Sequence, residues 1–326
     1  MIITVFEVSG DEREELDRLS REVPVTLRLQ NCNLNEETVD LAEGSDAVST
    51  LGRSTLSRAV LLKLHAMGIG YVSTRTIGFD HIDLEAAREL GIRVCHASYP
   101  AEAVADFTVM LMLMVLRHYK PAMWRQNVND FSLNGLMGSS LKSQTVGVVG
   151  TGNIGAAVIR SLSGFGCRIL AYNLFEVESL KPYTEFVKLE DIFRECDIIT
   201  FHVPSTLETY HIVNRRSLGT MKDGVILINT ARGDLMDIDA ITEGIETRKI
   251  GALAMDVFEN EQGIYHADRK NDILKNKDMV YLRQFPNVVL TQHMAFYTRQ
   301  SIISMVDTGI QGLLDMSSGV ATKLEL

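Results

Sequence analysis

Three segments in the second half of the sequence carry side chains that could bind an anion and transfer a proton. They are Ile228-Asn-Thr-Ala-Arg232-Gly-Asp234, Ala254-Met-Asp256-Val-Phe-Glu259-Asn-Glu261 and Thr291-Gln-His293-Met-Ala-Phe296-Tyr297. An arginine can hold a carboxylate through two parallel hydrogen bonds. A histidine can give and take a proton near neutral pH. Arg232 and His293 together therefore indicate chemistry on an anionic substrate that exchanges one proton.

The middle segment offers three carboxylates, one of which could support His293. A carboxylate beside the imidazole would orient the ring and stabilise its protonated form. Spacing alone does not choose among Asp256, Glu259 and Glu261, and at least one of them is expected to be solvated. Taken singly, Arg232 is also compatible with a surface ion pair, and His293 with a structural role.

A glycine-rich segment, Val146-Gly-Val-Val-Gly150-Thr-Gly152-Asn-Ile-Gly155, has the G-x-G-x-x-G spacing of a dinucleotide-binding turn. An apolar strand pattern precedes it, and a helical pattern follows over 156–163. Gly150 would allow the tight turn, Gly152 the approach of the pyrophosphate, and Gly155 close packing of helix on strand. The helix N-terminus would offer free N–H groups to the phosphates. We therefore predict dinucleotide binding here.

Asn173 bears on which dinucleotide binds. It ends the next strand, about 20 residues after the glycines, where an acidic residue normally holds the ribose 2′-hydroxyl of NAD. Asparagine can hydrogen-bond that hydroxyl but cannot repel the 2′-phosphate of NADP. No Arg or Lys follows closely, and Glu176 and Glu178 would oppose a phosphate. The prediction is NAD, with NADP left open.

The residues around these motifs predict two series of strands that alternate with helices. The first series lies at 2–6, 26–30, 47–49, 71–73 and 93–95, and the second at 145–149, 168–172, 197–202, 225–229, 252–256 and 288–291. Unbroken Val, Ile and Leu runs in the second series are typical of strands buried on both faces of a parallel sheet. The pattern predicts an α/β protein with two doubly wound parallel-sheet domains.

Helical patterns complete this arrangement. Residues 54–65 are expected to cover the first sheet. A helix over 101–118 is apolar around most of its circumference and should be buried between domains or subunits, with its Met110–Met114 run as core rather than as a cofactor site. The polar segment 126–140 is expected to form an arm or linker. The amphipathic helix 301–316 has no strand after it and is expected to return to the first domain.

Composition limits the remaining possibilities. A chain of 326 residues suggests two domains, and a net charge of -10 without a basic stripe argues against nucleic acid. The longest apolar run, 107–116, is too short to span a bilayer, and residues 1–6 read as a strand rather than a signal peptide. The four cysteines are far apart, which indicates reduced core cysteines, no metal site and a cytoplasmic address.

Several motifs together resemble the D-2-hydroxyacid dehydrogenase family, most closely its D-lactate dehydrogenases, including the vancomycin-resistance type. The resemblance rests on the glycine motif and on the segments Ser73–Asp83, Thr230–Gly233, Asp256–Glu261 and His293–Thr298. It runs over essentially the whole chain. It implies a Rossmann coenzyme domain at 101–297 and a flavodoxin-like substrate domain formed by 1–100 and 298–326.

The resemblance also implies a reaction and a set of site residues. A homodimer would reduce pyruvate, or a larger apolar 2-oxo acid such as 2-oxoisocaproate or phenylpyruvate, to the D-2-hydroxy acid with NAD(P)H. Arg232 would anchor the substrate, and His293 would exchange the proton with Glu261 as its partner. The other implied contacts are Ile77, Gly78, Tyr99 and Phe296 for substrate, and Gly150, Gly152, Asn153, Ile154, Gly155, Asn173, His202, Val203, Pro204, Thr230, Ala231 and Asp256 for cofactor.

Two positions depart from the family pattern, and rival functions exist on the same fold. Gln292 stands where proline is common, which would loosen the loop around His293, and Asn173 replaces the usual aspartate. Formate dehydrogenases pair Gln with His, and phosphoglycerate dehydrogenases would need an additional basic cluster. An NAD-sensing corepressor that binds peptides is the alternative from another class. The complete set of Arg232, Glu261 and His293 disfavours it.

Overall fold

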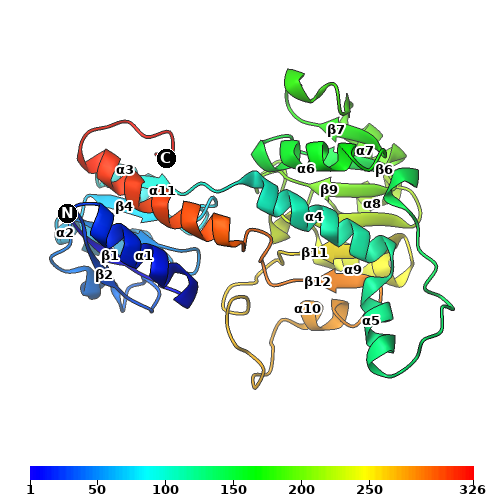
Figure 1. Ribbon diagram of the computed structural model, residues 1–326, viewed down its shortest axis with the longest axis horizontal. Coiled ribbons are helices and arrows are strands. Elements are labelled where there is room, and N and C mark those ends of the chain that lie inside the picture. Colours follow the sequence, from blue (N-terminus) through cyan, green and yellow to red (C-terminus); the bar gives the residue numbers. More distant parts are fainter. The chain divides into compact units, whose positions relative to one another are not determined.

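Two parallel sheets, one in each of two units of the chain, organise the structure (Figure 1). The computed structural model describes residues 1–326. The first unit comprises Met1–Pro100 and Tyr297–Leu326, and the second comprises Ala101–Phe296. None of the helices combines the length and the apolar character needed to cross a membrane.

The sheet of the first unit has five parallel strands in the order β2-β1-β3-β4-β5. Their bounds are β1 Ile2–Val5, β2 Thr26–Leu29, β3 Ala47–Thr50, β4 Tyr71–Thr74 and β5 Arg93–His96. This is the flavodoxin-like order, in which the order of successive strands reverses at a switch point between β1 and β3. The predicted flavodoxin-like fold is confirmed.

Helices cover both faces of this sheet, because successive strand residues point to opposite sides. Ile3, Val5 and Ala47 pack with α1 (Gly10–Glu22) and α11 (Arg299–Ser317), which lie side by side. The opposite face packs against α2 (Arg58–Ala66), α3 (Leu84–Glu89) and the 3-10 turn Val39–Ala42.

The C-terminal helix returns to the first unit, as predicted. Val306, Ile310 and Leu313 of α11 are buried in the core of this unit. Beyond the helix, the backbone N–H of Leu326 donates to the carbonyl of Val94 at 2.9 Å, and that of His96 donates to Leu324 at 2.9 Å.

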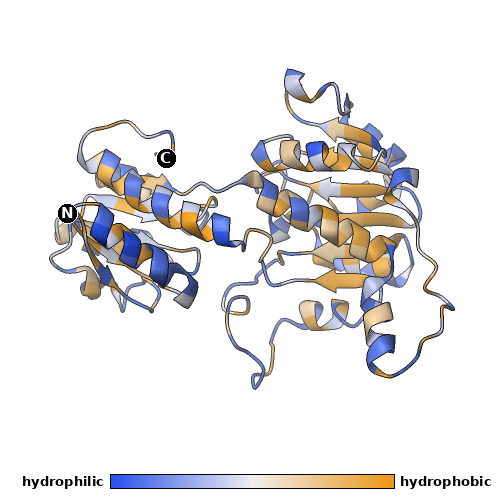
Figure 2. Cartoon of the chain, in the orientation of Figure 1, coloured by the Kyte–Doolittle hydropathy of each residue, from blue (hydrophilic) through white to orange (hydrophobic).

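The second unit contains seven parallel strands in the order β12-β11-β10-β9-β6-β7-β8. Their bounds are β6 Thr145–Val149, β7 Arg168–Tyr172, β8 Glu185–Phe186, β9 Ile198–Phe201, β10 Val225–Asn229, β11 Ile250–Met255 and β12 Val288–Leu290. Six of them follow the Rossmann order, with the switch point between β6 and β9, and β12 extends the sheet. Figure 2 shows how hydrophobic these strands are. The predicted doubly wound fold is confirmed; the two-residue β8 was not predicted.

Helices also sandwich the second sheet. One face is covered by α4 (Ala101–Leu116) and α6 (Asn153–Ser163). The other packs against α7 (Leu189–Glu195), α8 (Arg215–Thr220), α9 (Ile238–Glu246) and α10 (Lys277–Leu282). Short 3-10 turns lie at Leu141–Ser143, Glu178–Leu180 and Gly233–Leu235.

One feature after α4 differs from the expectations. A helix that was not predicted, α5 (Tyr119–Asn127), precedes the irregular segment 128–140.

The apolar helix α4 is only partly covered within this chain, because Met110 is 39% exposed while Met112 is fully buried. Its burial between subunits stays a prediction.

Candidate active site

The glycine turn after β6 has the geometry that a dinucleotide requires. Gly150 has φ +95°, which a side chain would strain. A Cβ at Gly155 would lie 1.9 Å from the Gly150 carbonyl oxygen, so only glycine lets α6 approach the strand this closely. A Cβ at Gly152 would meet open space, on the side where a ligand would approach. Asn153 and Ile154 form the first turn of α6 and present its N-terminus to that space. The turn thus fits a bound pyrophosphate.

Asn173 follows β7 and is half-buried beside this turn. Its side-chain oxygen lies 3.4 Å from the backbone N of Thr151, and its amide donates to the carbonyl of Phe175 at 3.0 Å. Thr151, Gly152, Asn173 and Phe175 line one hollow of the second unit. Asn173 therefore borders the hollow and also holds the glycine turn.

The residues after β9 form the opposite wall of the turn. A Cβ at Gly150 would lie 2.5 Å from the carbonyl oxygen of His202 and 2.8 Å from a methyl of Val203, and Pro204 follows. Burial lowers the pKa of His202 to about 3, and its Nε2 lies 2.9 Å from the Thr200 hydroxyl. The imidazole is therefore neutral at any ordinary working pH.

The loop after β10 places Arg232. The side-chain amide of Asn229, fully buried, donates to the Arg232 carbonyl at 2.8 Å, and its oxygen accepts from the backbone N–H of Ala231 at 3.0 Å. The Thr230 hydroxyl lies 2.9 Å from that of Thr108 on α4. The backbone of Gly233 packs directly on that of Phe258, and this contact brings the loop against the segment that follows β11.

The structure gives each of the three carboxylates after β11 a different partner. Asp256 is fully buried: Oδ1 accepts from the Thr291 hydroxyl at 2.6 Å and from the N–H of Met294 at 2.9 Å, and Oδ2 accepts from the N–H of Ala295 at 2.7 Å. Its carbonyl also accepts from the N–H of His293 at 2.6 Å. Asp256 thus ties the loop after β12 in place, although Gln292 replaces the usual proline. Its predicted contact with the cofactor stays a prediction.

Glu261 is the carboxylate that meets His293. Its Oε1 lies 2.5 Å from His293 Nδ1, and its Oε2 accepts from the N–H of Phe258 at 2.6 Å. Because a carboxylate only accepts, Nδ1 carries a proton and Nε2 is left to exchange one. The imidazole is 34% exposed, which keeps Nε2 reachable. Glu261 and His293, which sequence spacing could not pair, are in direct contact.

Glu259 points elsewhere. Its Oε2 lies 3.4 Å from His211 Nε2, and its Oε1 lies 3.5 Å from the hydroxyl of Tyr210, whose ring stacks on His211 at 3.9 Å between centroids.

Sequence reasoning also missed His266, whose Nε2 donates to the His293 carbonyl at 2.9 Å. No spacing rule connects these two histidines, since a turn after β11 brings them together.

Phe296 lies beside His293, and the remaining predicted contacts belong to the first unit. The rings of Phe296 and His293 form an edge-to-face pair at 6.4 Å. Ile77, Gly78 and Tyr99 are half-buried, and the Thr76 hydroxyl donates to the Gly78 carbonyl at 2.6 Å. Ile77 and Gly78 thus lie in a loop that is hydrogen-bonded within itself.

Comparison with known proteins identifies the chain's relatives. Residues 109–295 match the family model described as D-isomer specific 2-hydroxyacid dehydrogenase, NAD binding domain. An aromatic 2-oxoacid reductase of Clostridium sporogenes is 40% identical over 315 residues, which cover 96% of this chain and 95% of that protein. D-lactate dehydrogenase of Escherichia coli is 35% identical over 328 residues and covers 100% of both chains. The solved structure of a D-2-hydroxyisocaproate dehydrogenase superposes with a TM-score of 0.91 at 31% identity, covering 100% of this chain and 99% of that one.

Replacing Gly155 tests the glycine turn. The Gly155→Ala variant should lose at least ten-fold in affinity for NADH, because its Cβ would displace the Gly150 carbonyl 1.9 Å away. Fluorescence titration with NADH measures this. Gly164→Ala, at the C-terminal end of the same helix, serves as the matched control, because its Cβ would come no closer than 3.6 Å to the Ser161 carbonyl oxygen. Equal affinities in both variants would contradict the assignment.

Proposed function

The chain belongs to the family of D-isomer specific 2-hydroxyacid dehydrogenases, and from that premise we propose that His293, Glu261 and Arg232 carry its reaction. The protein is an NAD-dependent D-2-hydroxyacid dehydrogenase that reduces 2-oxo acids. The observation that carries the residue assignment is the 2.5 Å contact between His293 Nδ1 and Glu261 Oε1.

In the proposed mechanism the three side chains act on one substrate. Arg232 pairs with the substrate carboxylate and polarises the carbonyl. When bound, the reduced nicotinamide supplies the hydride that the carbonyl carbon accepts. Glu261 holds the ring and stabilises the protonated imidazole of His293 before transfer. His293 then donates the Nε2 proton to the carbonyl oxygen as negative charge develops there, which leaves a neutral imidazole. In the oxidative direction His293 accepts the hydroxyl proton.

The cofactor contacts are proposed to come from strand ends on both sides of the Rossmann switch point. The turn Gly150–Gly155 is assigned to the pyrophosphate and Asn173 to the adenosine ribose. His202, Val203 and Pro204, together with Thr230, Ala231 and Asp256, complete the set. The open space at Gly152 and the neutral His202 support this assignment.

The proposed substrate is a 2-oxo acid with a large apolar or aromatic side chain. The edge-to-face contact of Phe296 with His293 places aromatic surface beside the proton donor. A relative named aromatic 2-oxoacid reductase supports the same class. The backbone of Ile77 and Gly78 is proposed to receive the substrate carboxylate, with Tyr99 approaching it. We therefore expect phenylpyruvate and 2-oxoisocaproate to be reduced more efficiently than pyruvate.

Substitutions in the pair test the mechanism. His293→Ala should lower kcat about 10²- to 10⁴-fold, the range of general acid–base catalysis. Glu261→Gln should lower kcat by a smaller factor, because the amide oxygen can still accept from Nδ1 but carries no negative charge to stabilise the protonated ring. Steady-state reduction of pyruvate, 2-oxoisocaproate and phenylpyruvate with NADH and with NADPH measures both effects. His65→Ala, on the exposed side of α2, is the control. Near-wild-type kcat for His293→Ala would show that another group transfers the proton.

We also propose a cytoplasmic homodimer. The cysteines are free, and two are buried, which suits a reducing compartment. Around α5 and the segment after it, Trp124 is 70% exposed, Phe131 68% and Met137 91%. Large apolar side chains exposed at several positions of one segment are compatible with a protein–protein interface.

Light scattering after gel filtration tests the dimer. The wild type should have twice the chain mass of 36.3 kDa. Trp124→Ser combined with Phe131→Ser should shift the mass toward one chain, because both apolar contacts are lost. Leu207→Ser, which alters a side chain 98% exposed elsewhere in the second unit, should leave the mass unchanged. A single-chain mass for the wild type at micromolar concentration would refute the proposal.

A further inference from the structure

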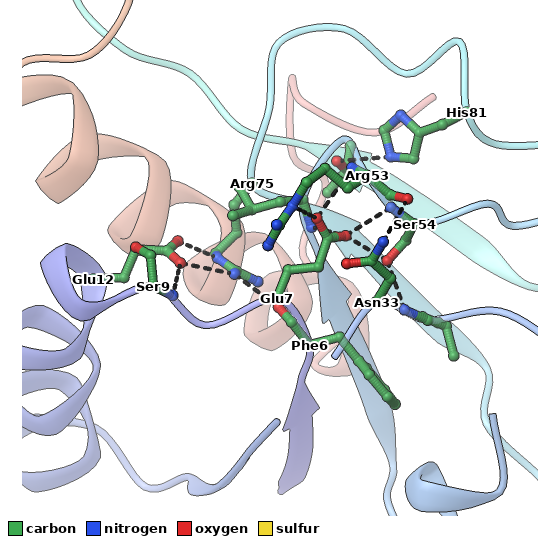
Figure 3. Close-up of polar contacts among 12 residues, drawn as sticks. Phe6, Glu7, Ser9, Glu12, Asn33, Arg53, Ser54, Arg75 and His81 are labelled. Atoms are coloured by element: carbon green, nitrogen blue, oxygen red, sulfur yellow. Dashed lines mark hydrogen bonds and ion pairs between the residues drawn. The ribbon is translucent and has the colours of Figure 1, made fainter. Parts of the chain in front are cut away.

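The carboxylate of Glu7 organises the loop that follows β3 (Figure 3). Glu7 lies just beyond β1, is fully buried and has φ +60°. Its Oε1 accepts from the N–H of Leu51 at 3.1 Å, from the N–H of Ser54 at 2.8 Å and from the Ser54 hydroxyl. Its Oε2 accepts from the N–H of Arg53 at 3.1 Å and from Arg53 Nε at 3.3 Å. Residues 51–54 therefore wrap around one carboxylate.

The guanidinium of Arg75 holds the loop that follows β4. Arg75 is fully buried, and its Nε and Nη2 donate to the two carboxylate oxygens of Glu12 at 2.7 and 3.2 Å. Its Nη1 donates to the Ser49 hydroxyl at 3.1 Å, and its Nη2 also donates to the Phe6 carbonyl at 3.0 Å. Since Phe6 and Glu7 are consecutive, one strand end anchors both loops (Figure 3).

The two loops also touch each other. The N–H of Arg75 donates to the carbonyl of Thr50 at 2.7 Å. Gly52 faces Thr76, since a Cβ built on it would come within ordinary contact distance, 3.7 Å, of the Thr76 methyl. The hydrogen bond between Thr50 and Arg75 is thus the direct link from the loop after β3 to the segment that continues through Thr76 to Ile77 and Gly78.

Stability alone does not account for these buried charges. The free-energy cost of removing an ion pair such as Glu12–Arg75 from water offsets most of the attraction between the two charges. Apolar side chains of similar volume would therefore often stabilise the unit at least as well. The charged groups add directional hydrogen bonds, because a carboxylate and a guanidinium hold their partners at defined angles. Such groups are expected where backbone atoms must be held in place.

The position of Glu7 in the sheet indicates what is held. Ligands of open parallel sheets bind beyond the carboxyl ends of strands at the switch point, which here lies between β1 and β3. The carboxylate of Glu7 occupies that point and engages the N–H groups that an anionic ligand would otherwise meet. We infer that Glu7 and Arg75 are positioning residues, which direct the substrate carboxylate to the backbone of Ile77 and Gly78 in the next loop. The inference rests on the proposed function of those two residues.

Glu7→Gln is the direct test. The new amide N–H₂ opposes at least one backbone N–H of residues 51–54, while size and shape are preserved. We expect KM for the 2-oxo acid to rise about ten-fold, as for the loss of a hydrogen bond to a charged group, with kcat and KM for NADH changed less than two-fold. Ser54→Ala removes one hydroxyl donor only and should raise the same KM by a smaller factor, so that the test stands even if Glu7→Gln folds poorly.

Arg93→Gln is the matched control. Arg93 donates to both oxygens of Glu325 at 2.7 Å and to the Met316 carbonyl at 2.6 Å, as Arg75 does to Glu12 and Phe6, but it begins β5 at the amino edge of the same sheet. Its loss should lower the melting temperature and leave KM for the oxo acid unchanged. If KM for the oxo acid rose equally in Arg93→Gln and Glu7→Gln, the rise would come from a general loosening of the first unit. That result would overturn the inference.

Hydrogen–deuterium exchange separates this inference from the proposed function. Glu7→Gln should speed exchange in residues 51–54 and also in 76–78, whereas Arg93→Gln should do neither. Faster exchange confined to 51–54, or an unchanged KM for the oxo acid, would overturn the positioning role. If the wild type reduces no 2-oxo acid, the proposed function fails, and the exchange pattern still decides whether Glu7 holds the 76–78 loop.

Discussion

The buried carboxylate of Asp256 is the constraint on which the proposed acid–base site depends. A charge without access to water must be satisfied by donors, and here a hydroxyl and two backbone N–H groups of residues 291–295 supply them. They fix the loop in which His293 has φ +52°, a conformation that non-glycine residues adopt only when their surroundings impose it. Once the backbone is held, Glu261 can orient the ring and stabilise its protonated form.

Parallel topology explains why segments far apart in sequence meet. β10, β11 and β12 are neighbours in the sheet, and their carboxyl ends lead to Arg232, to the Asp256–Glu261 turn and to His293. In the first unit the ends of β1, β3 and β4 are similarly tied together by Glu7 and Arg75. In both units buried charged side chains connect adjacent strand ends, while apolar residues of the strands and helices form the cores.

The sequence predicted the fold better than it predicted the partners of individual side chains. Unbroken apolar runs located the longer strands, and the spacing of Gly150, Gly152 and Gly155 located the dinucleotide turn. The roles of the three carboxylates could not be derived, because they depend on the direction of each side chain in a turn that includes Asn260 at φ +59°. Resemblance, not spacing, selected Glu261. The anchoring roles of Asp256 and Arg75 were missed for the same reason: burial of a charge is decided by tertiary contacts.

The kinetics of Asp256→Asn test the central claim most directly. The amide would place a donor against the N–H groups of the His293 loop while leaving Glu261, Arg232 and the glycine turn unaltered. If Asp256 holds the proton donor in place, kcat for 2-oxo acid reduction should fall about 100-fold, a larger change than any change in KM for NADH that follows from its proposed cofactor contact. An unchanged kcat, with or without a rise in KM for NADH, would contradict the account and limit Asp256 to the cofactor.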